Sequence, residues 1–235
     1  MTSAWSPEWL VNSCAFRKMT AWRGVEAQYL VPTMRLVDTP AEQELLEQLL
    51  EGTKPPLPEH AEEKHYLLMT PFRYTPHHAH RFRPATENGQ WYGAATVEGA
   101  CAELAYWRNR FILDSVGLRD TELISEYGFY PALVRGSAID LTEDPWVQNR
   151  PSWTHGSDYS ACHALAKAAR DVGVQWIRYE SVRAPGTPCA VVFTPDGLFE
   201  PVEKIDRSIQ RWSCKASRSR VMFTTLGQPG FVWDF

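Results

Sequence analysis

The sequence predicts an α+β fold built on a compact mixed sheet with few helices. From residue 66 onward, short runs rich in β-branched and aromatic residues are separated by turn residues, a pattern typical of strands. Only two helical patterns interrupt these runs, at irregular intervals, whereas a doubly wound fold would alternate strands and helices regularly. With 235 residues, of which 44% are hydrophobic and 22% charged, the chain can bury one large core or two small ones.

A helix is expected in the N-terminal part of the chain. Thr39-Pro40-Ala41-Glu42 supplies a capping threonine, a proline suited to the first helical turn and a glutamate that completes a capping box. Four leucines at positions 45, 46, 49 and 50 follow as an apolar stripe, and Gly52 ends the helix. Three prolines between residues 55 and 58 then predict a linker. Residues 1–53 are therefore predicted to be a helical N-terminal extension that packs on the main domain, residues 66–235, or on a second copy of the chain, because so short a segment is unstable alone.

The main domain is expected to contain four clear strands and two helices. The strands are predicted at residues 66–69, 133–141, 174–183 and 189–194. One helix starts near Thr96 and carries apolar side chains at helical spacing as far as Phe111. The other covers about residues 157–172 and stops at Gly173.

Charge and cysteine content exclude several classes of protein. A net charge of −4 and a pI near 6.0 give no general attraction to nucleic acid or to an anionic membrane. Five widely spaced cysteines without a C-x-x-C pair are typical of free thiols in a reducing compartment. We find neither a signal-peptide pattern nor an apolar run long enough to span a membrane, so we expect a cytoplasmic protein.

Five cations near the C-terminus recur at steps of three and four residues, which would align them on one face of a helix. They are Lys204, Arg207, Arg211, Lys215 and Arg218, with Arg220 nearby. Such a face is either simply solvated, or a site for ligand phosphates, or a surface for an acidic partner.

The most informative residues are Arg81-Phe82, Tyr92, Glu103 and the segment Tyr179-Glu180-Ser181-Val182-Arg183. Together they resemble the RES-domain family, which is named for its Arg, Glu and Ser. Tyr92 and Glu103 have the family's spacing of eleven residues, whereas Arg81 lies one residue farther from Tyr92 than in the family, so Arg83 is an alternative for the arginine. Asp140-Leu141-Thr142 resembles the family's Asp-Leu-Thr strand end, and the resemblance covers roughly residues 66–205.

The resemblance implies an ADP-ribosyltransferase-like fold and an NAD-consuming toxin that a cognate antitoxin, encoded nearby, neutralises. NAD would be a substrate, and no metal would be required. The implied catalytic residues are Glu103, Arg81, Tyr92 and Ser181. The implied substrate-binding residues are Arg83, Arg73, Tyr74, Arg183 and Tyr179.

These residue types suit the cleavage of NAD. Breaking the bond between nicotinamide and ribose passes through an oxocarbenium-like state, which a carboxylate such as Glu103 stabilises. An arginine at position 81 or 83 can bind the pyrophosphate with two parallel hydrogen bonds. Tyr92 offers a ring for stacking and a hydroxyl for the ribose, and Ser181 can orient the ribose or the carboxamide.

Other activities remain open. The acceptor of ADP-ribose could be phosphate, water or a protein side chain, and the chain could instead be a non-catalytic nucleotide-binding or interaction module. No G-x-G-x-x-G or G-x-x-x-x-G-K-[ST] pattern indicates a Rossmann fold or a P-loop. His77-His78-Ala79-His80 lacks partners at metal-ligand spacing, and we expect these histidines beside the ligand cleft or in solvent. A homodimer is compatible with the sequence, whereas direct binding to nucleic acid is not expected.

Overall fold

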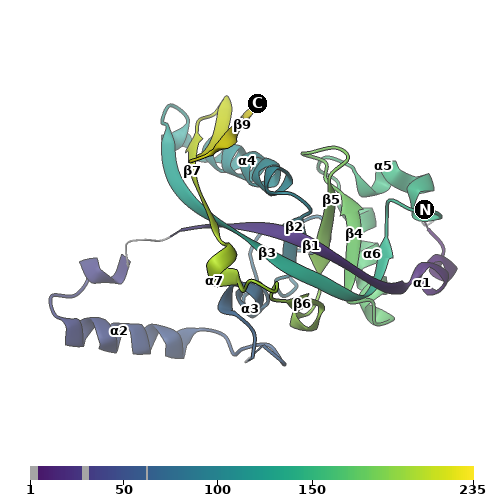
Figure 1. Ribbon diagram of the computed structural model, residues 1–235, viewed down its shortest axis with the longest axis horizontal. Helices are drawn as coiled ribbons and strands as arrows, with labels where there is room; N and C mark the ends of the chain where they lie inside the picture. Colours follow the sequence, from purple (N-terminus) through teal and green to yellow (C-terminus); the bar gives the residue numbers. More distant parts are fainter. Residues whose placement is uncertain (1–4, 28–31, 62) are drawn as a thin grey trace.

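The fold is known from a computed structural model that describes residues 5–27, 32–61 and 63–235 (Figure 1). Its described residues form one mixed sheet of nine strands, and most pairings are antiparallel. The strands are β1 (Ala15–Glu26), β2 (Trp91–Ala94), β3 (Leu123–Asp140), β4 (Trp176–Glu180), β5 (Pro188–Val192), β6 (Leu198–Phe199), β7 (Gln210–Ala216), β8 (Arg220–Thr225) and β9 (Gln228–Asp234). The helices are α1 (Pro7–Ser13), α2 (Pro40–Thr53), α3 (Tyr66–Arg73), α4 (Val97–Asp114), α5 (Arg150–Trp153), α6 (Ser160–Asp171) and α7 (Ile205–Ser208), with short 3₁₀ turns at Pro32–Arg35, Val116–Leu118, Trp146–Asn149 and Pro195–Gly197.

Five of the strands form a closed circuit. The sheet runs in the order β1-β2-β5-β4-β3, and β3 pairs back with β1. β7, β8 and β9 continue from the first half of β3 as an antiparallel meander. The α+β class and the mixed sheet predicted from the sequence are confirmed.

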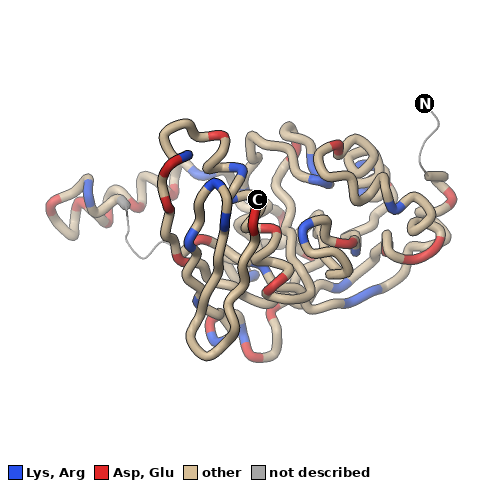
Figure 2. The backbone as a smooth tube through the Cα atoms, turned by 90° about the horizontal axis from the view of Figure 1, so that it is seen from above, with Lys and Arg blue, Asp and Glu red and all other residues tan. Residues whose placement is uncertain are grey.

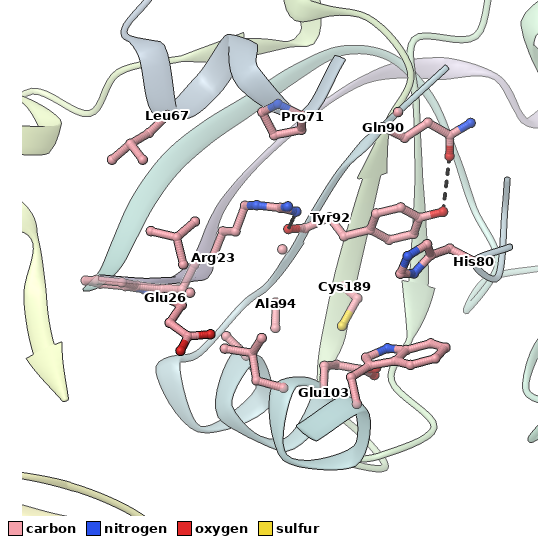
Figure 3. A pocket seen from close by; sticks show the side chains of 18 of the residues that line it. Arg23, Glu26, Leu67, Pro71, His80, Gln90, Tyr92, Ala94, Glu103 and Cys189 are labelled. Carbon is pink, nitrogen blue, oxygen red and sulfur yellow. Dashed lines mark hydrogen bonds between the residues drawn. The ribbon is translucent and has the colours of Figure 1, made fainter. Parts of the chain in front are cut away.

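Side chains alternate between two cores on opposite faces of the sheet. On β5, Cys189 and Val191 belong to one core and Ala190 and Val192 to the other. Helices α4 and α6 pack on the first core, whereas α3 and α7 pack on the second. Figure 3 shows Leu67 and Pro71 of α3 above a pocket and Glu103 of α4 below it.

The N-terminal part of the chain differs from the predicted helical extension. Residues 15–26 form β1, which pairs with β3 without interruption from Ala15↔Ala138 to Glu26↔Tyr127. The prediction missed this strand because β1 is stabilised by pairing with residues more than a hundred positions away, while its own sequence mixes charged and apolar residues. β1 is thus an integral part of the sheet, and the domain boundaries at residues 53 and 66 stay a prediction.

Helix α2 confirms the predicted helix within this segment. The Thr39 hydroxyl accepts a hydrogen bond from the backbone of Glu42, and the Glu42 carboxylate accepts from the backbone N–H of Thr39, which completes the capping box. The helix projects away from the rest of the molecule (Figure 1), and Leu45 and Leu49 on its apolar stripe are 56% and 60% exposed.

Residues 66–69 belong to helix α3, so the strand predicted there is wrong. A run of four apolar residues fits a helix as well as a strand, and Leu67, Leu68 and Phe72 bury one face of this helix. Pro71 lies inside the helix and has no N–H for the carbonyl group of Leu67. The hydroxyl of Tyr130 donates to that carbonyl at 2.8 Å instead.

The other predicted elements of the main domain are present. The strands predicted at 133–141, 174–183 and 189–194 overlap β3, β4 and β5. Thr96 caps α4 through a hydrogen bond from the backbone of Gly99, and Gly173, with a φ of +82°, follows the end of α6.

The cations near the C-terminus do not share a helical face. Residues 210–216 form strand β7, in which Trp212, Cys214 and Ala216 are buried and the residues between them are exposed. Several of these cations are paired with carboxylates: Lys204 with Glu200, Lys215 with Glu122, Arg218 with Asp120 and Arg220 with Asp234. Basic and acidic residues are accordingly interspersed along this part of the chain (Figure 2).

Candidate functional site

A cavity of about 930 Å³ opens between α3, α4 and the strands β1 and β2 (Figure 3). Its volume is at the upper end of the range for small-molecule sites in proteins. The lining includes the aromatic residues Trp22, Tyr66, Tyr74, Tyr92, Tyr106, Trp107, Tyr159 and Tyr179, and the arginines Arg23, Arg81, Arg83, Arg183 and Arg211. Glu26 and Glu103 are its carboxylates. Such a cavity suits a ligand that combines aromatic rings with negative charge.

Glu103 lies on the second turn of α4, and its carboxylate is held by Ser181. The Ser181 hydroxyl donates a hydrogen bond of 2.6 Å to Oε1 of Glu103. Glu103 is part of the cavity lining, whereas Ser181 is only 1% exposed and lies behind it. The structure therefore brings together two candidate residues that are 78 positions apart in the sequence.

Ser181 begins the turn that follows β4. Its Oγ accepts hydrogen bonds from the backbone N–H groups of Arg183, at 3.1 Å, and Ala184, at 2.9 Å. A hydroxyl group has one proton to donate and two lone pairs to accept with. All three are used within the protein, so the local role of Ser181 is to fix both the turn and the Glu103 carboxylate.

Tyr92 on β2 presents its ring to the cavity, and its hydroxyl is held by the loop before the strand. The hydroxyl donates to Oε1 of Gln90 at 3.1 Å and accepts from the backbone N–H of Phe82 at 3.3 Å. Burial raises the pKa of Tyr92 well above its usual value, because the phenolate would lose its solvation. Tyr92 therefore acts as a neutral hydroxyl and an aromatic surface at neutral pH.

Arg81 lines the cavity, and part of its hydrogen-bonding capacity is already used within the protein. Its Nη1 donates to the carbonyl groups of Trp153, at 2.9 Å, and His155, at 2.8 Å. Its guanidinium group lies 5.0 Å from the ring centre of Tyr159, within the range of a cation–π contact.

Arg83 has a different position, although it is only two residues away. The residue is only 1% exposed, and its guanidinium group donates to the carbonyl groups of Pro76, Pro84 and Glu87, and also to that of His78. Burial lowers the pKa of Arg83. Arg83 thus organises the loop before β2, which leaves Arg81 as the better candidate for the arginine of the motif.

Three of the remaining candidates line the cavity and one does not. Arg183 stacks on Tyr106, with 3.4 Å between the guanidinium carbon and the ring centre, and Tyr179 and Tyr74 are also part of the lining. Arg73 instead donates to the carbonyl of Pro55 and to the Glu51 carboxylate at the end of α2. The structure therefore separates Arg73 from the other candidate residues, because its position on α3 directs it to the segment after α2.

His80 lies against Tyr92 and Trp107, with ring centres 5.7 and 5.2 Å apart. Burial, assisted by the positive charge of Arg83 and Arg23, lowers its pKa to about 4, so the ring is neutral at pH 7. The sequence had placed this histidine beside a cleft or in solvent, and the structure places it in the cavity. No group of three His, Cys, Asp or Glu side chains suited to a metal ion occurs among the described residues.

Sequence reasoning missed the aromatic residues on α4 and the whole contribution of β1. Tyr106 and Trp107 follow Glu103 by one turn of α4, so the helical period itself could have placed them beside it. Arg23 gave no comparable signal, because β1 reaches the cavity only through its pairing with β2 and β3.

Comparison with known proteins identifies the main domain. A family model, the RES domain, matches residues 57–215. The chain belongs to the RES-domain family. No curated protein matches this RES-domain chain. Among solved structures it is similar to a chain in the M. tuberculosis MbcT-MbcA toxin-antitoxin complex, with 12% sequence identity and a TM-score of 0.48 over 90% of this chain and 92% of the other.

Proposed function

We propose that this RES-domain protein is an enzyme that cleaves the bond between nicotinamide and ribose in NAD. The observation that carries the proposal is the Glu103 carboxylate, which Ser181 holds at the wall of a large cavity lined by aromatic rings and arginines. Membership of the RES-domain family supports the same activity.

In the proposed reaction the bond from ribose C1′ to the nicotinamide nitrogen breaks, and both electrons leave with nicotinamide, which becomes neutral. Positive charge develops on the ribose ring, and the Glu103 carboxylate stabilises it. An oxygen of water or phosphate then bonds to C1′, and its proton, where it has one, is released. The hydrogen bond from Ser181 keeps the carboxylate in one orientation during these steps.

The lining of the cavity suits the rest of the substrate. Tyr92, Tyr106 and Trp107 provide faces on which nicotinamide or adenine can stack. The nicotinamide ring of NAD is positively charged, and the low pKa of His80 keeps this neighbouring ring neutral, which avoids repulsion. A role for Arg81 in binding the pyrophosphate is supported by its hydrogen bonds, since among the described residues the backbone carbonyl groups that it contacts are bound through Nη1 alone.

Incubation of the purified protein with NAD, with and without inorganic phosphate, tests this function. We expect release of nicotinamide in both cases if water is an acceptor, and release that depends on phosphate if the reaction is a phosphorolysis. ADP-ribose attached to a protein would instead indicate transfer to a side chain. Intact NAD under all conditions would contradict the proposal and would favour a non-catalytic binding module.

We further propose that the protein is a cytoplasmic toxin controlled by a separate antitoxin protein. Membership of the RES-domain family and the opening of the cavity to solvent support control by a separate protein. Expression alone should arrest growth, and co-expression with the product of the adjacent gene should restore it by covering the cavity. A stable complex of this kind would bury roughly 1,600 Å² or more in total. Failure of the neighbouring protein to co-purify would argue against the antitoxin.

A further inference from the structure

Helix α2 presents an apolar stripe to solvent instead of to the core. None of the residues from Pro40 to Thr53 is buried, and Leu45 and Leu49, one turn apart on the helix, are the most exposed leucines of the stripe. Met34 and Leu36, which lie just before the helix, are also exposed. Figure 1 shows that α2 stands away from the sheet. An exposed apolar surface of this kind is typical of a protein interaction site.

The contacts that hold α2 in place are polar. The amide of Gln43 donates to the hydroxyl of Thr33 at 2.7 Å, and that hydroxyl donates to Oε1 of Glu47 at 2.9 Å. At the other end of the helix, Arg73 of α3 donates to the carboxylate of Glu51 at 2.9 Å. The helix is thus fixed in position through polar side chains, which leaves most of the leucine stripe available to another molecule.

α2 is also an acidic helix. Its sequence contains four glutamates and no lysine or arginine. Glu51 is paired with two cations, whereas none of the ion pairs among the described residues involves Glu44 or Glu47. Glu44, Glu47 and Glu51 recur at steps of three and four, so they form an acidic row along the flank of the leucine stripe. The surface therefore combines an apolar stripe with uncompensated negative charge.

This combination favours one kind of occupant. A helix with an apolar stripe of its own and with lysines or arginines beside it would cover the leucines and neutralise the glutamates in a single contact. A second copy of α2 would instead bring two sets of four glutamates together, and an anionic membrane would repel them. We propose that α2 is the docking site for another protein that presents a basic amphipathic helix.

The docking site is separate from the cavity in which we propose that NAD is cleaved. No residue of α2 belongs to the described residues that line this cavity. α2 also lies outside residues 57–215, which match the RES-domain model. Residues of α2 can therefore be changed without altering the lining of the cavity.

The test measures the binding of three labelled synthetic peptides to the full chain by fluorescence anisotropy. The first peptide is a helix with leucines along one face and lysines on both flanks. The second has glutamates in place of these lysines, and the third has the composition of the first in scrambled order. We expect the wild type to bind the first peptide at least about 10-fold more tightly than the other two, with an affinity that falls as salt is added.

A first pair of variants tests the apolar stripe. Leu45→Gln combined with Leu49→Gln should weaken the binding of the first peptide on the order of 10- to 100-fold, because two apolar contacts are lost. Val116→Gln combined with Leu226→Gln is the matched control, since both of these side chains are exposed outside α2. The control should bind the peptide as the wild type does.

A second pair of variants tests the charge. Glu44→Gln combined with Glu47→Gln should weaken the binding of the first peptide roughly 3- to 10-fold and reduce its dependence on salt. Glu126→Gln combined with Glu203→Gln removes two exposed carboxylates outside α2 and should leave the affinity unchanged.

Three outcomes would overturn the proposal. The first is equal affinity of the wild type and the leucine variant for the basic peptide, or equally tight binding of the acidic peptide. The second is self-association of the wild type in sedimentation velocity that the leucine variant abolishes, which would assign the surface to a second copy. The third is binding to phosphatidylglycerol vesicles that is lost in the same variant, which would assign the surface to a membrane.

Folding and NAD consumption are measured on the same variants. Their melting temperatures should stay close to that of the wild type, because the replaced side chains are exposed and glutamine is a good helix former. A large decrease in the leucine variant would show that the stripe serves the folding of the chain and would overturn the proposal. The α2 variants should consume NAD at the wild-type rate. A wild type that binds the basic peptide but does not consume NAD would keep the docking site and contradict only the proposed function.

Discussion

Replacement of Ser181 by alanine removes one oxygen atom and, with it, three hydrogen bonds. One is the bond of 2.6 Å that the hydroxyl donates to Glu103. The other two are accepted from the backbone N–H groups of Arg183 and Ala184. The first bond concerns the proposed catalytic carboxylate, and the other two concern only the turn after β4.

The two effects have different magnitudes and different readouts. A hydrogen bond to a charged group contributes about 1.5–3 kcal/mol. If the full amount orients Glu103 in the transition state, kcat falls about 10- to 150-fold, at 1.36 kcal/mol for each tenfold change. Because Ser181 is 1% exposed, water cannot easily reach the two N–H groups, and the free energy of unfolding should fall by about 1–3 kcal/mol.

Kinetics of NAD consumption and thermal unfolding measure these effects separately. Ser217→Ala is a matched control, because Oγ of Ser217 also accepts from two backbone N–H groups of a turn, those of Ser219 and Arg220, and none of these three residues lines the cavity. The control should lose stability without losing kcat. We expect Ser181→Ala to lower kcat with little change in KM, since the bond positions a catalytic group. A wild-type kcat in Ser181→Ala would refute the positioning role.

Three further outcomes follow from the same site. Arg81→Gln should weaken NAD binding with little change in stability. Arg83→Gln should instead lower the free energy of unfolding by about 3 kcal/mol, because it leaves buried carbonyl groups without a donor. Calorimetry measures the first effect and urea unfolding the second, and weaker binding by Arg83→Gln together with lower stability of Arg81→Gln would exchange the roles of the two arginines. Gly89→Ala should reduce the melting temperature, because a Cβ atom there would lie 1.8 Å from the carbonyl oxygen of Pro71; an unchanged melting temperature would contradict this close packing. His80 has a pKa of about 4 in the folded protein and an ordinary value of 6.5, so as the pH falls the unfolded chain binds a proton before the folded protein does. The free energy of unfolding should therefore decrease by up to about 3 kcal/mol as the pH is lowered from 6.5 to 4. His80→Gln should reduce this loss in urea unfolding, and an equal dependence on pH in both proteins would rule out His80 as its source.

Local signals predicted much of the fold correctly. The capping box at Thr39 and Glu42, the cap at Thr96 and the glycine at position 173 all depend on residues close together in the sequence. β1 could not be predicted in this way, because its stability comes from pairing with β3, whose residues lie more than a hundred positions farther along the chain. The error at β7 had a different origin. Its cations recur at helical spacing, but the buried Trp212 and its apolar neighbours recur at the period of a strand, and this second pattern reflects the packing.

For the candidate site, the motif indicated which residues lie together but not how they are bonded. Spacing placed Tyr92 and Glu103 in one site, and both line the cavity. The bond between Ser181 and Glu103 joins β4 to α4, so no local pattern could have shown it. Arg81 and Arg83 could not be distinguished from the sequence, because the difference between them is the set of backbone carbonyls that the folded loop offers to Arg83.

The rate of nicotinamide release from NAD by wild-type protein and by Glu103→Gln tests the proposed activity most directly. Glutamine keeps the size of the side chain and can still accept a hydrogen bond from Ser181, but it lacks the negative charge that stabilises the developing cation. We expect the wild type to release nicotinamide. We expect Glu103→Gln to keep a similar melting temperature and to release nicotinamide at a rate that is lower by on the order of 100-fold or more. Release at the wild-type rate by a folded Glu103→Gln protein would contradict the assignment of Glu103 as the catalytic carboxylate.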